Sequence, residues 1–244
     1  MNRNRTIDVP GAHGPAPEFI VTPETLDAVS LPGDRGGMIL GSGPDGQPVA
    51  VSLLRPAPTR IVSVGGLYFA RQLALRALAT GAWVIIATAR PAAWKMLEHT
   101  AGQTPDGKPV PLFQIRRLTH FPLPQFDEDT PLLVIHDGGA VPQQELFPPR
   151  AAWQTTMYVL PYLHPQVAST PAANAADLVL LQRLQLSGAN HAQRIWSLQP
   201  QQAQQLTQLK DDQVIVLGNW TWTRVQLITS PKEQEILGPI RRGD

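Results

Sequence analysis

The sequence predicts a three-layer α/β domain that has a mostly parallel central sheet, an N-terminal β-hairpin and a C-terminal antiparallel pair. Short apolar runs with the length of buried strands alternate with helix-like segments through the middle of the chain. A turn rich in glycine lies between two strand-like runs near the start, and two more such runs lie near the end. Because buried strands that alternate with helices pack as parallel sheets with right-handed crossovers, the middle region determines the fold class.

A proline-rich segment precedes the predicted domain. Residues 1–25 contain four prolines and few apolar anchors, so we expect an extended arm there. Residues 26–244 are predicted to form one domain, because 244 residues with 43% hydrophobic content suffice for a single sizeable core. Its first element is a hairpin of residues 38–40 and 49–53, which we expect to cap one edge of the main sheet.

The central sheet is predicted to contain at least five strands. Five are expected at residues 60–64, 82–87, 132–136, 155–160 and 178–181, and residues 110–116 are the candidate for a further one. Helices are expected at residues 73–79, 91–98 and 200–209. The last of these is glutamine-rich, but its apolar residues recur at helical spacing, which favours a surface helix with an amide face.

The C-terminal region is predicted to add a hairpin and a short helix within residues 210–244. Residues 213–217 and 222–228 are strand-like runs on either side of a Gly-Asn turn. Ser230 is followed by proline and, three residues on, by Glu233, which is the pattern of a capping box. A helix is therefore expected to begin there.

Composition excludes several classes of protein. The 20 basic and 19 acidic residues give a formal net charge of +1, so the charge pattern does not support a nucleic-acid partner. The absence of cysteine excludes disulfides, thiol catalysis and thiolate metal sites. The six histidines show no i, i+4 pairing, so we expect no metal site.

The chain is expected to be soluble and cytoplasmic. Its N-terminus is positively charged but lacks the apolar stretch of a secretory signal. No apolar run approaches the ~20 residues that a membrane helix requires.

Residues 65–72 occupy the place of a phosphate-binding loop, between a strand-like and a helix-like run. Such a loop reads G-x-x-x-x-G-K-[ST], because glycines let backbone N–H groups surround the phosphates, the lysine reaches their oxygens and the hydroxyl holds Mg²⁺. Gly65 matches the first glycine. The second glycine, the lysine and the hydroxyl residue are replaced by Ala70, Arg71 and Gln72.

Three interpretations of this segment stay open. In the first, the rings of Tyr68 and Phe69 fill the space that phosphates would occupy. In the second, the segment simply starts the helix and buries these rings under the sheet edge. In the third, the Arg71 guanidinium and the free backbone N–H groups of Gly65 and Gly66 bind an anion.

A second candidate for nucleotide chemistry is Asp137, which follows the predicted strand 132–136. A carboxylate at the end of a buried strand has the form of the Mg²⁺-positioning element of nucleoside triphosphatases. Gly138 and Gly139 follow it, where a catalytic glutamate would be expected. The alternative is a turn residue whose carboxylate bonds to backbone N–H groups.

Trp220 and Trp222 are the candidates for a partner-binding patch. Their spacing of two places both rings on one face of a strand. Packing of these rings within the domain is an equally good interpretation.

The stretch from residue 36 to residue 140 resembles the motor ATPases of the FtsK/SpoIIIE type, and in particular the degenerate motor domains of actinobacterial type VII secretion systems. The resemblance rests on the order and spacing of MILG, DGQPV, PTRIVSVGG and RQLALRAL, which occupy residues 38–41, 45–49, 58–66 and 71–78. It implies a RecA-like P-loop fold. It also implies that Gly65 is the first loop glycine, that Arg71 and Gln72 stand at the lysine and hydroxyl positions, and that Asp137 is the metal-side carboxylate.

From these observations we predict a non-catalytic P-loop-like domain that acts as a structural or regulatory interaction module, next to a motor or secretion ATPase. No serine lies in a G-x-S-x-G motif and no acid–base pair stands out, so no catalytic residue is predicted. No cofactor is expected, and ATP with Mg²⁺ is disfavoured. The alternatives are a phosphate- or nucleotide-binding enzyme or sensor that uses Arg71 with Gly65 and Gly66, and a homo-oligomeric scaffold.

Overall fold

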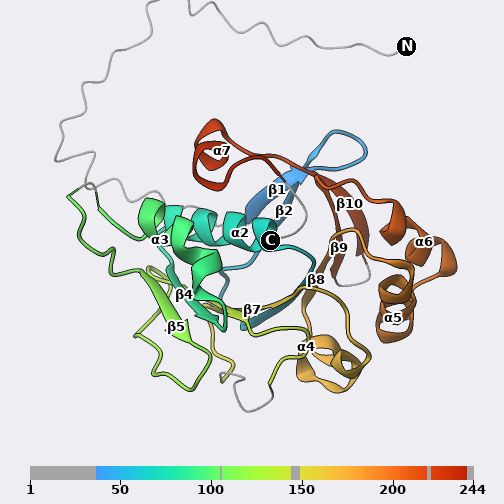
Figure 1. Cartoon of the computed structure of the whole chain (residues 1–244), viewed down its shortest axis with the longest axis horizontal. Coiled ribbons are helices and arrows are strands. Elements are labelled where there is room, and N and C mark those ends of the chain that lie inside the picture. Colours follow the sequence, from blue (N-terminus) through green and yellow to red (C-terminus); the bar gives the residue numbers. More distant parts are fainter. Residues whose placement is uncertain (1–36, 105, 144–148, 219–220, 241–244) are drawn as a thin grey trace, which may run out of the picture. The chain divides into compact units, whose positions relative to one another are not determined.

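In the computed structural model, ten β-strands of the described residues form one continuous sheet with helices on both faces (Figure 1). The structure describes residues 37–104, 106–143, 149–218 and 221–240. The chain divides into two units, Met1–Asp34 and Arg35–Asp244, and the described residues all belong to the second. The predicted arm, residues 1–25, lies outside the described residues.

The strand order across the sheet is β2-β1-β10-β9-β8-β3-β7-β6-β4-β5. The strands are β1 (Met38–Ser42), β2 (Pro48–Val51), β3 (Thr59–Val64), β4 (Trp83–Thr88), β5 (Phe113–Arg117), β6 (Leu132–Asp137), β7 (Gln154–Leu160), β8 (Leu178–Leu181), β9 (Gln213–Gly218) and β10 (Thr221–Leu227). In this order, each pair of neighbouring strands from β2 to β8 is antiparallel, and each pair from β8 to β5 is parallel. The predicted fold class is therefore confirmed, including the N-terminal hairpin at one edge and the C-terminal antiparallel pair.

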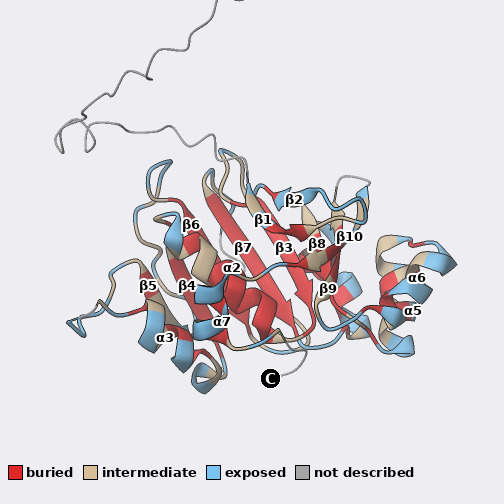
Figure 2. Cartoon of the chain, turned by 90° about the horizontal axis from the view of Figure 1, so that it is seen from above, coloured by how far each residue is buried: buried red, intermediate tan, exposed pale blue. Residues whose placement is uncertain are grey.

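Side chains of the central strands contribute to apolar clusters on the two faces of the sheet, because successive residues of a strand point to opposite faces. Two of these clusters are large, and Ile85, Leu132 and Val134 form a smaller one. Strand β3 is buried along its whole length (Figure 2). Its Ile61 belongs to one large cluster, whereas Val62 and Val64 belong to the other. The first cluster lies under α2 (Leu67–Ala79), η1 (Pro91–Trp94), α3 (Lys95–Ala101) and α7 (Pro231–Leu237). The second lies under η3 (Pro165–Ser169), α4 (Pro171–Asn174), α5 (Leu186–Trp196) and α6 (Pro200–Gln208). The result is the expected three-layer arrangement.

Helix α2 begins at Leu67, so the predicted start at residue 73 is wrong. The turn before it needs only two glycines, and the residues that follow are apolar enough to be buried as a first helical turn. Tyr68 and Phe69 are 1% and 0% exposed and belong to the core cluster under the sheet. The expectation that their rings fill a phosphate site is therefore corrected, and the alternative, that the segment starts the helix and buries these rings, is confirmed.

The capping box of α7 is confirmed. Ser230 Oγ accepts a hydrogen bond from Glu233 N at 3.1 Å, and Glu233 Oε2 accepts one from Ser230 N at 2.8 Å. Glu233 also pairs with Arg76 of α2, with 2.5 Å between Oε1 and Nε. Burial opposes the charged form of Glu233, but the hydrogen bonds from Arg76 and the Ser230 backbone outweigh it and hold the pKa of Glu233 below its usual value. Arg76 also donates hydrogen bonds to the carbonyl oxygens of Ile39 in β1 and of Ile228 just after β10. These bonds connect α2 to the antiparallel part of the sheet.

Within the part of the chain that the structure describes, no helix combines the length and apolar character needed to span a bilayer.

Candidate functional site

Two adjacent glycines form the whole turn between β3 and α2. Gly65 has φ +142°, a conformation that favours glycine, and Gly66 is the N-cap of α2. Both N–H groups have acceptors inside the protein. Gly65 N donates to the Leu160 carbonyl oxygen at 2.9 Å, and Gly66 N donates to Gln182 Oε1 at 2.6 Å. A Cβ atom on Gly65 would lie 2.0 Å from that same Gln182 oxygen, so the buried Gln182 side chain fills the space beside the turn.

We expect the Gln182→Ala variant to lose about 1–2 kcal/mol of unfolding free energy, because the partly buried Gly66 N–H loses its acceptor. Chemical denaturation of the full chain measures this change. The matched control is Gln205→Ala, since Gln205 Oε1 accepts a bond from Trp222 Nε1 at the exposed surface and its loss should change stability by less than about 0.5 kcal/mol. Equal stability of the Gln182 variant and the native chain would contradict a structural role for this amide.

Arg71 and Gln72, predicted at the lysine and hydroxyl positions of a phosphate loop, lie in the second turn of α2. The buried Arg71 side chain donates to the carbonyl oxygen of Ala93 in η1. Gln72 Nε2 donates to the carbonyl oxygen of Ile228 at 3.0 Å, just after β10. These hydrogen bonds join α2 to neighbouring elements, so the structure does not bring the two side chains to the N–H groups of the glycine turn.

Asp137 ends β6, where the metal-side carboxylate was predicted. Its oxygens accept hydrogen bonds from Thr88 Oγ1 at 2.9 Å and from Trp94 Nε1 at 2.8 Å. Arg90 completes the set with NH2 at 2.8 Å and Nε at 3.0 Å, a two-point ion pair. The Asp137 side chain is fully buried, and Arg90 is 36% exposed. Sequence analysis did not identify these three partners, which follow from the adjacency of β4 and β6.

Among the described residues, no cluster of three or more His, Asp or Glu side chains is arranged to hold a metal ion.

His136, the residue before Asp137, stacks on Tyr158 of β7. The ring centroids are 5.2 Å apart and the interplanar angle is 17°. Both rings line a cavity of about 20 Å³, enough for one water molecule. Burial lowers the pKa of His136 to about 4 and raises the pKa of Tyr158. Both rings are therefore neutral at pH 7.

A larger cavity of about 520 Å³ lies at the carboxyl ends of β3, β7 and β8. Gly65 is part of its wall, so the cavity adjoins the strand–helix turn. The polar side chains that line it are His164, Arg183, Gln185, Ser187 and His191. The carboxyl ends of parallel strands are where sheets of this class bind ligands.

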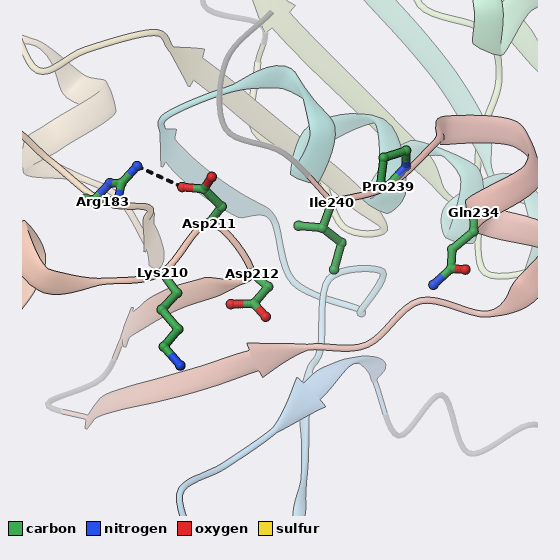
Figure 3. Close-up of a pocket in the computed structure, with 7 residues that line it drawn as sticks. All are labelled: Arg183, Lys210, Asp211, Asp212, Gln234, Pro239 and Ile240. Atoms are coloured by element: carbon green, nitrogen blue, oxygen red, sulfur yellow. Dashed lines mark hydrogen bonds and ion pairs between the residues drawn. The ribbon is translucent and has the colours of Figure 1, made fainter.

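Arg183 also lines a wider cleft of about 800 Å³ (Figure 3). Its NH2 group pairs with Asp211 Oδ1 at 2.8 Å. The remaining walls are formed by Lys210 and Asp212 of the same loop and by Gln234, Pro239 and Ile240 of the C-terminal segment. Because two basic and two acidic side chains share this cleft, its charges do not favour one class of ligand.

Only one of the two tryptophans predicted as a partner patch is described, because Trp220 lies outside the described residues. Trp222 is partly buried against the cluster under α5 and α6, and its Nε1 donates to Gln205 Oε1 at 2.9 Å. Trp222 therefore packs within the domain, and partner binding at this pair stays a prediction.

No family model and no curated protein matches the sequence. Solved structures do match the fold. VirB4 of Thermoanaerobacter pseudethanolicus superposes with a TM-score of 0.59 over 82% of this chain and 99% of that chain, at 9% sequence identity. The chain has a RecA-like P-loop fold. An identity this low shows the fold alone.

Two further structures superpose with lower TM-scores. The genome packaging NTPase B204 from Sulfolobus turreted icosahedral virus 2 has a TM-score of 0.44 and 10% identity over 70% of this chain and 98% of that chain. The cytoplasmic domain of the Thermomonospora curvata type VII secretion ATPase EccC has a TM-score of 0.43 and 8% identity over 85% of this chain and 32% of that chain. What this RecA-like P-loop fold does in the present chain has to be argued from its own residues.

Proposed function

We propose that this domain is a non-catalytic member of the P-loop fold, which serves in the cytoplasm as a structural or regulatory interaction module of a secretion or translocation motor. The observation that carries the proposal is the engagement of Asp137 by Arg90, Thr88 and Trp94. A carboxylate that already accepts these bonds would have to break them to position Mg²⁺.

The glycine turn supports the same conclusion. Phosphoryl transfer depends on backbone N–H groups, a lysine, a hydroxyl and a metal carboxylate that act together on the phosphates. Here the N–H groups of Gly65 and Gly66 bond to Leu160 and Gln182, and Arg71 bonds to Ala93. A phosphate at this turn would compete with all three bonds, and this also weakens the alternative of an anion site built from Arg71 and the two glycines.

A motor as partner is supported by the sequence resemblance to FtsK/SpoIIIE ATPases, and the fold shared with VirB4 agrees with it. In such an assembly the domain contributes contacts rather than hydrolysis. Light scattering at micromolar concentration tests whether the domain also forms homo-oligomers.

We expect Mg-ATP to raise the melting temperature of the full chain no more than ATP in EDTA does, and we expect no ATP hydrolysis. A ligand at 100 times its Kd would stabilise the chain by about 2.7 kcal/mol, roughly 5–10 °C for this size, so binding would be visible. An Mg²⁺-dependent rise that is lost in Arg71→Ala but kept in Arg194→Ala, a change on the exposed side of α5, would contradict the proposal.

A further inference from the structure

The cavity of about 520 Å³ at the carboxyl edge is the right size for a mononucleotide-sized ligand. Gly65 forms part of its wall, but Gly66 and Gln182, which are joined by a hydrogen bond, do not line it. A ligand could therefore occupy it while the glycine turn stays closed.

Several side chains that line this cavity can donate hydrogen bonds. His164 Nδ1 accepts a hydrogen bond from Gln166 N at 3.2 Å, so the ring proton of the neutral imidazole is on Nε2. Arg183 adds a guanidinium, one NH2 group of which is paired with Asp211, and Ser187 adds a hydroxyl. His191 Nδ1 lies 3.2 Å from the Leu163 carbonyl oxygen and donates to it, so the neutral ring adds no donor to the cavity. No acidic side chain is among the described residues that line the cavity. This set of groups is suited to an anion.

The first turn of α5 lies in the wall of the same cavity through Gln185, Ser187 and Gly188. Gln185 is the N-cap and makes no side-chain cap bond. The first N–H groups of a helix have no intrahelical partner and carry partial positive charge, which favours an anion. This helix start lines the same cavity as the Arg183 and His164 side chains.

Tyr162 supplies an apolar face to this polar set. It follows β7, lines the cavity and is 58% exposed, so its ring is accessible to a ligand. A planar ring of a ligand could stack on it.

We propose that this cavity binds a phosphate-bearing small molecule with a planar ring, of mononucleotide size, whose phosphate lies at the start of α5 between Arg183 and His164 and whose ring lies on Tyr162. The site differs from a phosphate-loop site, because it uses α5 instead of α2 and requires no Mg²⁺. It does not depend on whether the domain is catalytic.

Isothermal titration of the full chain with AMP in EDTA tests the proposal. We expect binding that weakens by about tenfold or more in Arg183→Gln, because a charge-assisted bond to the phosphate is lost. Ser187→Asp should abolish binding, because it places a carboxylate in the anion position while remaining compatible with the first turn of a helix. Arg194→Gln, in the last turn of the same helix, is the matched control and should bind like the native chain.

Adenosine and inorganic phosphate separate the contributions of ring and anion. Both should bind more weakly than AMP, and Tyr162→Ala should weaken AMP and adenosine but not phosphate. Circular dichroism checks that each variant is folded. The proposal is overturned if AMP does not bind at millimolar concentration, or if Ser187→Asp binds it as well as the native chain. An Mg²⁺ requirement would instead point to the glycine turn and would count against the proposed function.

Discussion

Replacement of Asp137 by alanine is expected to lower the free energy of unfolding by about 3 kcal/mol, the cost of removing one partner from a buried ion pair. Three donors lose their acceptor at once. Trp94 is 0% exposed, so its indole N–H would be left buried without a partner. Arg90 is 36% exposed and can turn to water, which limits the loss. Urea denaturation in EDTA measures the effect without any contribution from metal ions.

The control for this experiment is Asp211→Ala. Its partner Arg183 is 41% exposed and Asp211 itself 49%, so that surface pair should contribute less than about 1 kcal/mol. The two roles of Asp137 predict opposite results. A carboxylate reserved for Mg²⁺ would be dispensable for folding in EDTA, so an Asp137→Ala chain as stable as the native one would restore the metal site as the better interpretation.

Acidification is expected to destabilise the chain through His136. Burial holds the pKa of His136 at about 4 in the folded chain, below the ordinary value of 6.5 that applies after unfolding. Between these values the unfolded chain binds a proton that the folded chain does not, so stability is fully present above pH 6.5 and falls as the pH drops towards 4. The difference corresponds to about 3 kcal/mol. No described group bonds to Nε2 of this ring to offset the loss.

Urea denaturation between pH 7.5 and pH 4 isolates this effect when the native chain is compared with His136→Phe. The phenyl ring can keep the stack on Tyr158 but takes up no proton, so the variant should lose less stability on acidification by roughly the same 3 kcal/mol. His99→Gln removes an exposed imidazole and should leave the acid dependence unchanged. Parallel pH profiles of the native chain and His136→Phe would show that another group causes the acid sensitivity.

Much of the fold was predictable because its signals are local. The run that predicted a strand at residues 60–64 is β3, Thr59–Val64, in which every residue is buried. The Ser230 capping box gave the start of α7. The start of α2 was misplaced because residues 65–72 were compared with an eight-residue phosphate-binding loop, which would place the helix after them. Helix α5 was missed because its N-cap is Gln185, a residue type that gives no cap signal.

The contacts at the candidate site depend on strand order, which local patterns do not contain. Gln182 and Gly66 are 116 residues apart in sequence and meet because β8 lies next to β3. Arg90 and Asp137 are 47 residues apart and meet because β4 lies next to β6. The residue types at these strand ends were visible in the sequence. With the order of the strands in hand, a buried Asp137 opposite an arginine would have predicted an ion pair in place of a metal ligand.

The pairing of β1 with β10, which places Gly41 opposite Leu227, has a consequence for biosynthesis. The β1-β2 hairpin leaves the ribosome long before the strand that joins it to the rest of the sheet has been translated. Closing so long a loop is slow. Until β10 pairs with β1 and β9, the hairpin and the outer edge of β9 expose unpaired backbone groups. Newly made chains are therefore most vulnerable to aggregation in the interval before residue 227 emerges, and an N-terminal fragment that stops short of it should be recovered mainly as insoluble material.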